Sequence, residues 1–193
     1  MNPVMETILT RRSVRSYTRR QIPPEDLDAI LSAGSYAPSA MGRQTWRFTA
    51  IQAPEILKKV NETIRQTLLS IPIVEETHPY LIRLIQKAAD ENAEFLYGAP
   101  TYIIVSNQKD NANAMADCAL AIGNMMLAAH SLGIGSCWLN QLPGLTEQTL
   151  VRDLLNELAI PEDHNVYGSL VLGYAAGEPK PADPRKDVIR IFR

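Results

Sequence analysis

The 193-residue sequence predicts an α+β or mixed α/β fold, in which one sheet is covered by helices. Segments with strand character lie between segments with helical periodicity, but they do not follow the regular βαβ order of a parallel doubly wound sheet. A chain of this length can bury roughly 70% of its unfolded surface in a single core. No repeat, low-complexity tract or Gly/Ser linker divides it. We therefore expect residues 1–193 to form one domain.

Helices are expected where apolar residues recur at helical spacing behind a start signal. Asn2 can cap free amides and Pro3 suits the first helical position, so a short helix should run to about Thr10. Pro24 opens a second helix, and Gly34 is its expected C-terminal cap. Further helices are expected over residues 54–68, 80–96, 114–132 and 147–158.

Strands are expected in shorter segments between these helices. Trp46, Phe48 and Ala50 alternate with polar neighbours, which is typical of a half-buried strand. Residues 70–79 contain two prolines and little periodicity, so they should form a loop, and the proline-rich tail from Ala175 should be irregular. The expected strands cover residues 45–52, 101–106, 136–139 and 166–174.

Composition and charge argue against several classes of protein. No apolar run reaches the length of about 20 residues that a membrane-spanning helix needs. The first residues have neither a basic start nor an apolar stretch of signal-peptide length, so we expect a cytoplasmic protein. A net charge of −2 creates no field that would attract duplex nucleic acid.

Familiar catalytic and metal-binding patterns do not occur in the sequence. Cys118 and Cys137 have no CxxC spacing, and the histidines have no ligand spacing, so no metal site is expected and both thiols should be buried. There is no HExxH, GxSxG or Walker motif and no glycine-rich dinucleotide fingerprint. We name no catalytic residue, but an enzyme whose cofactor carries the difficult step needs none of these motifs.

Two basic clusters lie at opposite ends of the chain. Arg11, Arg12 and Arg15 surround Ser13, and Arg185 is followed by Lys186. Arginine offers forked donors that suit phosphate, and a serine hydroxyl adds another donor. A basic turn that complements a helix dipole, and a solvated basic tail, explain the same residues. Both interpretations remain open on the residues alone.

Several motifs together resemble the nitroreductase family. Residues 9–17 (LTRRSVRSY) and 37–48 (APSAMGRQTWRF) are similar to its two N-terminal signatures, RRSxRxF and APSxxNxQPW. The further matches are GAP at 98–100, LGIGSCW at 132–138 and LGY at 172–174. They follow the order and spacing of the family and cover almost the whole chain, most weakly over 70–96.

The resemblance implies a homodimer that binds FMN at the subunit interface. It implies a central mixed, mainly antiparallel sheet flanked by helices, and a C-terminal extension, residues 175–193, that wraps the partner. The residues that would hold the phosphate, ribityl chain and pyrimidine edge of FMN are Arg11, Arg12, Ser13 and Arg15, with Arg185 and Lys186 closing on the phosphate. Those from the other subunit would be Pro38, Ser39 and Ala40, with Gln44 near the cofactor. Those along the isoalloxazine would be Trp138, Leu139 and Asn140, where a backbone amide near Asn140 would donate to flavin N5.

The implied reaction is a ping-pong transfer of hydride from NADH or NADPH through FMN to a nitroaromatic, quinone or enone. Flavin destruction and reductive dehalogenation are alternatives within the same fold, and residues 70–96 would form the lid that decides between these reactions. His78 and Tyr80 could contact the substrate there, although ordinary surface positions are the favoured interpretation of both. A second hypothesis, from a different functional class, is a protein that stores or senses FMN without turnover. A third hypothesis is a domain that binds no flavin. Gly42 replaces the usual asparagine of the family, so any side-chain contact at that position is lost, and Thr45 replaces the usual proline.

Overall fold

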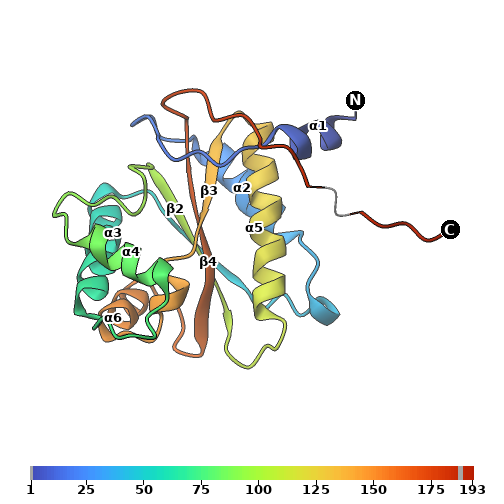
Figure 1. Ribbon diagram of the computed structural model, residues 1–193. Helices are drawn as coiled ribbons and strands as arrows, with labels where there is room; N and C mark the ends of the chain where they lie inside the picture. The colour runs from blue at the N-terminus through green and yellow to red at the C-terminus, as the bar shows by residue number, and fades with distance from the viewer. Residues whose placement is uncertain (1, 187–188) are drawn as a thin grey trace.

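The computed structural model describes residues 2–186 and 189–193, and these build one antiparallel sheet with helices on both faces (Figure 1). The strands stand in the order β1-β2-β4-β3, and each neighbouring pair is antiparallel. Their bounds are β1 (Arg47–Ile51), β2 (Thr101–Gln108), β3 (Gly135–Leu139) and β4 (His164–Gly173). The predicted α+β class is therefore confirmed.

Within the described residues, six α-helices and two short 3₁₀ turns accompany the strands. The helices are α1 (Pro3–Thr10), α2 (Pro24–Ser35), α3 (Pro54–Ser70), α4 (Pro79–Ala88), α5 (Ala114–Ser131) and α6 (Thr149–Glu157). The turns are η1 (Ala40–Gly42) and η2 (Pro143–Leu145). None of the helices in the described part of the chain is long and apolar enough to cross a bilayer.

The two faces of the sheet are covered by different helices. α2 and α5 lie on one face, whereas α3, α4 and α6 lie on the other (Figure 1). Successive side chains of a strand point to opposite faces, so β2 sends Tyr102 and Ile104 into the core under α3 and Ile103 and Val105 into the core under α5. All four side chains are buried, which explains why this strand is a continuous apolar run.

Gly34 has a different role from the predicted one. α2 continues through Ser35, and Gly34 is buried against α5 rather than ending the helix. A Cβ on Gly34 would lie 2.4 Å from the Met125 Cε, so the glycine allows the two helices to approach closely. The prediction of a glycine cap is wrong, because close helix packing uses the same residue type.

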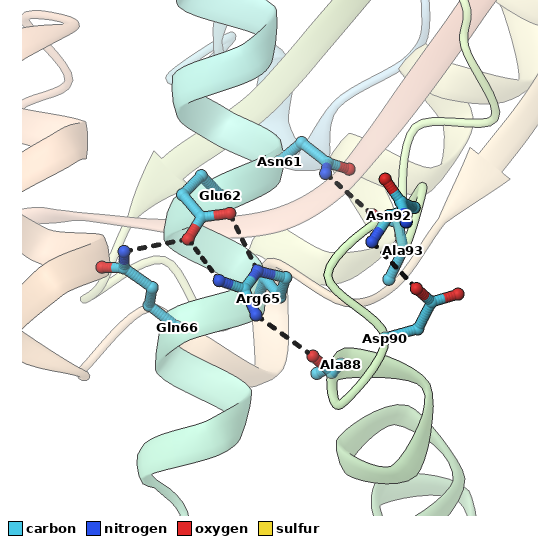
Figure 2. Close-up of polar contacts among 8 residues, drawn as sticks. All are labelled: Asn61, Glu62, Arg65, Gln66, Ala88, Asp90, Asn92 and Ala93. Carbon is cyan, nitrogen blue, oxygen red and sulfur yellow. Dashed lines mark hydrogen bonds and ion pairs between the residues drawn. The ribbon is translucent and has the colours of Figure 1, made fainter.

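The helix predicted over residues 80–96 is too long, because α4 ends at Ala88. Figure 2 shows how side chains of α3 hold the segment that follows. The Asn61 Nδ2 donates to the Ala93 oxygen at 2.9 Å, and the Arg65 Nη1 donates to the Ala88 oxygen at 3.4 Å. The Asp90 Oδ1 accepts a hydrogen bond from the Asn92 nitrogen, the local turn that aspartate favours. Turn chemistry therefore ends the helix although apolar periodicity continues.

Candidate flavin site

The segment that carries the first basic cluster lies across the ends of β3 and β4. Ser13 forms a parallel bridge with Ser136, and the Val14 nitrogen donates to the Ser136 oxygen at 2.9 Å. A Cβ on Gly135 would lie 2.7 Å from the Val14 Cγ2, so only glycine allows the segment to pack this close to β3. Gly173 is crowded by Tyr17 in the same way at the end of β4. These two glycines give the basic segment its position.

The two basic clusters meet in one cleft of about 700 Å³. The N-terminal segment forms one wall, and the chain after β4 forms the other (Figure 1). Lys186 is exposed and does not line the cleft. The predicted residues in the lining are Arg11, Arg12, Ser13, Arg15 and Arg185. The charged residues that join them are Lys180, Glu178 and Asp183. Basic groups are in excess, so the cleft favours an anion.

Arg11 and Arg12 differ in how their guanidinium groups are used. The Arg12 Nη1 donates to the Leu9 oxygen at 2.8 Å and to the Arg11 oxygen at 2.6 Å, so it caps the end of α1. The Arg11 Nη1 is buried and has no hydrogen-bond partner among the described residues. Within residues 2–186 and 189–193, no ion pair involves a basic residue of the cleft. A phosphate oxygen would supply the partner that Arg11 lacks, so the cleft fits a phosphate-bearing cofactor.

A second cleft of about 310 Å³ lies beside the first, and Arg15 lines both. One wall is the end of β3 with the residues that follow, where the Asn140 Oδ1 accepts a hydrogen bond from the Trp138 Nε1. Tyr80 of α4 and Tyr97 form part of the other wall. The full lining is Arg15, Tyr80, Tyr97, Cys137, Trp138, Leu139, Asn140 and Gln141. An aromatic and amide-lined cleft and a basic cleft thus share Arg15 as a lining residue.

Tyr80 of α4 lines this cleft, and so does Tyr97, which the sequence did not indicate. Burial, followed by the neighbouring phenol of Tyr97, raises the pKa of Tyr80 above its ordinary value, so Tyr80 keeps its proton. His78 does not line the cleft, because its ring caps α4 by accepting from the Tyr80 nitrogen at 3.2 Å. Tyr97 has φ +57°, an uncommon backbone conformation for a tyrosine. Its position directly before the GAP motif was the signal that could have identified it.

The loop with Pro38, Ser39, Ala40 and Gln44 lies far from the basic cleft within one chain. The Ala40 nitrogen donates to Asp117 in the first turn of α5, whereas His130 in the last turn contacts Thr10, the neighbour of Arg11. At 1.5 Å per residue, Asp117 and His130 are separated by about 20 Å along the helix axis. Figure 1 accordingly places η1, drawn in pale blue, at the opposite end of α5 from α1.

The backbone conformation at Gly42 accounts for a glycine at the position where the family motif has asparagine. Its φ is +65°, and a Cβ at this position would meet no atom within 4 Å. Glycine adopts this left-handed region freely, and asparagine enters it more readily than most residues. Glycine and asparagine can thus both adopt the conformation seen at Gly42, although only asparagine would offer a side chain to a ligand.

The remaining reactive side chains have structural roles. Cys118 and Cys137 are free and buried, as expected, and burial raises the pKa of the Cys118 thiol to about 12 and also raises that of Cys137. Such thiols are poor nucleophiles. In the part of the chain that the structure describes, no three His, Cys, Asp or Glu side chains are grouped to hold a metal ion.

The fold and the two clefts together define an α+β protein that is suited to a planar cofactor with a phosphate group. The comparison with known families agrees with this class. Residues 8–174 match the model of the Nitroreductase family, and the chain belongs to that family.

Individual relatives match over their whole lengths. A nitroreductase of Bacteroides fragilis, solved with bound FMN, shares 42% sequence identity with a TM-score of 0.92, and the match covers 100% of both chains. An FMN-bound nitroreductase of Desulfitobacterium hafniense shares 27% identity with a TM-score of 0.85, again over 100% of both chains. A protein of Archaeoglobus fulgidus with the provisional name NADH dehydrogenase/NAD(P)H nitroreductase is 35% identical over 100% of this chain and 98% of its own.

Proposed function

We propose that this protein is a homodimeric, FMN-dependent oxidoreductase that takes electrons from NADH or NADPH and passes them to a nitroaromatic, quinone or enone. The position of Arg15 in the lining of both clefts carries the proposal. A basic cleft alone would suit any phosphate, and an aromatic cleft alone would suit many small molecules. A basic cleft and an aromatic cleft that share one arginine match the shape of FMN, whose phosphate and ring lie at opposite ends of a flexible chain.

The phosphate end of FMN would lie in the basic cleft. Arg11 offers the buried Nη1 that lacks a partner among the described residues, and Ser13 and Arg185 offer further donors from the two walls. Arg12 contributes mainly through its charge, because its Nη1 is occupied at the end of α1. Lys186 would have to move to reach the phosphate, since it lies outside the lining.

The ring end of FMN would lie in the second cleft, along Trp138, Leu139 and Asn140. Arg15 would then stand at the pyrimidine edge, where a cation stabilises the anionic reduced ring. A backbone N–H near Asn140 would donate to flavin N5. When bound, FMN supplies the hydride chemistry, and the chain supplies orientation, charge and exclusion of water. Tyr80 and Tyr97 would border the space that the nicotinamide and the acceptor occupy in turn, which is a ping-pong arrangement.

A homodimer accounts for features that one chain leaves unexplained. α1 has no buried residue, and Val4, Met5, Ile8 and Leu9 are each about half exposed or more. The tail carries further exposed apolar side chains, among them Ile191 and Phe192. Grouped exposed apolar residues mark surfaces that another molecule covers. A second copy would cover them, and we propose that residues 175–193 wrap this partner. The two free thiols suit a reducing compartment, so we place the protein in the cytoplasm.

Anaerobic mixing of the FMN-loaded protein with NADH and with NADPH tests the proposal against a storage or sensing role. We expect the flavin absorbance to bleach with at least one nucleotide and to return when a nitroaromatic, quinone or enone is added. Flavin that stays oxidised with both nucleotides for minutes would leave the non-catalytic FMN-binding protein as the better account. Purified protein that takes up no FMN would contradict both.

A further inference from the structure

We propose that Asp117 is a positioning residue for the FMN site of the partner subunit, because it holds the loop 39–44 in the shape that completes that site. The inference rests on the proposed function, in which this loop reaches FMN bound by the other chain. Asp117 itself would touch neither FMN nor substrate, and it would act only through the loop.

The Asp117 carboxylate is hydrogen-bonded directly to the start of the loop and is linked through Asn111 to its end. Its Oδ1 accepts from the Ala40 nitrogen at 3.0 Å, and its Oδ2 accepts from the Asn111 Nδ2 at 3.1 Å. The same Nδ2 donates to the Thr45 Oγ1 at 3.2 Å, and this hydroxyl donates to the Asn107 Oδ1 at 2.7 Å. The entry and the exit of the loop are therefore anchored through one carboxylate.

A carboxylate in this environment needs a reason. Asp117 is 3% exposed, and no basic side chain pairs with it among the described residues. Asp117 lies in the first turn of α5, where the helix dipole favours a carboxylate. Its two hydrogen bonds, from the Ala40 nitrogen and the Asn111 amide, both serve to hold the loop, so the carboxylate fixes the shape of that loop.

The loop that Asp117 holds has a strained backbone. Met41 has φ +53° and Gln44 has φ +50°, in a region that side chains other than glycine seldom adopt. The Met41 side chain is 90% exposed, so burial in its own chain does not hold it there. The Gln44 nitrogen donates to the Ser39 Oγ at 3.1 Å, which closes the loop on itself. Strain that the surroundings impose on an exposed loop is typical of ligand-binding segments.

The position of the loop favours a ligand that belongs to another chain. About 20 Å of α5 separates Asp117 from the end of the helix where the basic cleft lies. Contacts from this loop therefore do not reach a phosphate held by Arg11 of the same chain. They can reach FMN held by a second copy whose cleft faces the loop.

A heterodimer that joins two defective chains tests the inference. Arg11→Ala removes the phosphate contact, Asp117→Asn removes the carboxylate with little change of shape, and each homodimer should bind FMN at least tenfold more weakly than wild type. The two chains are coexpressed with different tags, purified as the mixed dimer and titrated with FMN. If the loop of each chain serves the FMN site of its partner, the Arg11→Ala cleft meets the Asp117→Asn loop in one site, and the other site contains neither change. One FMN per dimer should then bind with wild-type affinity. A mixed dimer without a wild-type site overturns the inference.

A second variant keeps the inference testable if the Asp117→Asn protein does not fold. Ala40→Pro removes only the N–H that donates to the carboxylate. Proline suits the first position of a helical turn, and Ser39 already has the extended ψ of 152° that a residue before proline needs. Paired with Arg11→Ala, this variant should restore the same single site, and its failure to do so counts against the inference.

A matched control separates positioning from general stability. Asn61→Ala also removes two hydrogen bonds that anchor a loop on the other face of the sheet. The Asn61 Nδ2 donates to the Ala93 oxygen (Figure 2), and the Asn61 Oδ1 accepts from the Phe95 nitrogen. It should lower the melting temperature but leave the FMN Kd within twofold of wild type. Equal loss of FMN affinity in Asn61→Ala and Asp117→Asn would overturn the positioning role.

The outcome for the Arg11→Ala homodimer distinguishes this inference from the proposed function. If that homodimer binds FMN as wild type does, the phosphate site is wrong, and the Asp117→Asn homodimer then decides alone. A tenfold or greater rise in its Kd supports the role of Asp117, and an unchanged Kd overturns it.

Discussion

Replacing Arg11 with alanine should weaken FMN binding and leave the apoprotein at least as stable as before. The Arg11 Nη1 is buried and has no partner among the described residues, so a phosphate oxygen would be its first hydrogen-bond acceptor. A hydrogen bond to a charged group contributes about 1.5 to 3 kcal/mol. At about 1.4 kcal/mol for each factor of ten, the FMN Kd should rise roughly 10- to 150-fold.

The two stability effects of Arg11→Ala should have opposite signs. Without FMN, the variant removes a buried donor that is unsatisfied, so the free energy of unfolding should stay constant or rise. With FMN at 100 times the wild-type Kd, ligand binding stabilises the wild-type protein by about 2.7 kcal/mol. The same FMN concentration should stabilise the variant by only about 0.3 to 1.4 kcal/mol, because its Kd is higher.

Quenching of FMN fluorescence gives the Kd, and urea unfolding with and without FMN gives the two stabilities. Arg12→Ala is one control, since it removes the cap of α1 and should destabilise the apoprotein instead. Arg19→Ala is another, because Arg19 is exposed, lies outside the cleft and makes the same change in net charge. The reasoning is refuted if Arg11→Ala keeps the Kd within twofold of wild type, or if Arg19→Ala matches its effect.

Three further predictions concern the site and its surroundings. Gly135→Ala should destabilise the protein by about 1 to 3 kcal/mol in urea unfolding and weaken FMN binding, because its Cβ would displace Val14 and the basic segment. A loss below about 0.5 kcal/mol, which is the usual scatter of surface substitutions, would contradict the close packing of Val14 against β3. Gly42→Asn should cost less than Gly42→Val in the same assay, since asparagine tolerates φ +65° and valine loses roughly 1 to 2 kcal/mol there; equal losses would be inconsistent with a conformational role. Burial, then the charges of the basic segment, lowers the pKa of His130 below its ordinary 6.5, so apoprotein stability should be complete above pH 6.5 and fall as the pH drops toward the folded pKa. His130→Gln should reduce this slope without abolishing it, because the pKa of His164 is lowered as well, and an unchanged melting-temperature profile from pH 7 to 5 would argue against the role of His130.

The sequence predicts where the basic groups lie along the chain but not what each guanidinium does. Arg11 and Arg12 are equivalent by composition and by the resemblance to a family motif. The structure separates them, because the Arg12 side chain turns back onto the last carbonyls of α1 while the Arg11 Nη1 stays without a partner among the described residues. That difference depends on where α1 ends relative to β3, which is a tertiary property.

Element boundaries fail where one residue type serves two purposes. Gly34 was predicted as a cap, yet its lack of a side chain is used for packing against Met125. The segment after Ala88 keeps apolar residues at helical spacing, yet Asp90 and the contacts from α3 turn the chain. The strands were predicted to within a few residues, because buried β-branched runs have fewer competing explanations.

Two features of the single chain lie at opposite ends of α5, and one dimeric arrangement would bring them together. At one end is a buried guanidinium nitrogen without a partner among the described residues, and at the other is a strained, exposed loop held by the buried Asp117 carboxylate. A twofold dimer that places the loop of one chain over the cleft of the other would bring both to the same FMN, so that binding would satisfy the nitrogen and use the preformed loop. If the loop served its own chain instead, the mixed dimer of Arg11→Ala and Asp117→Asn would contain no intact site, and the measured FMN stoichiometry separates these two arrangements.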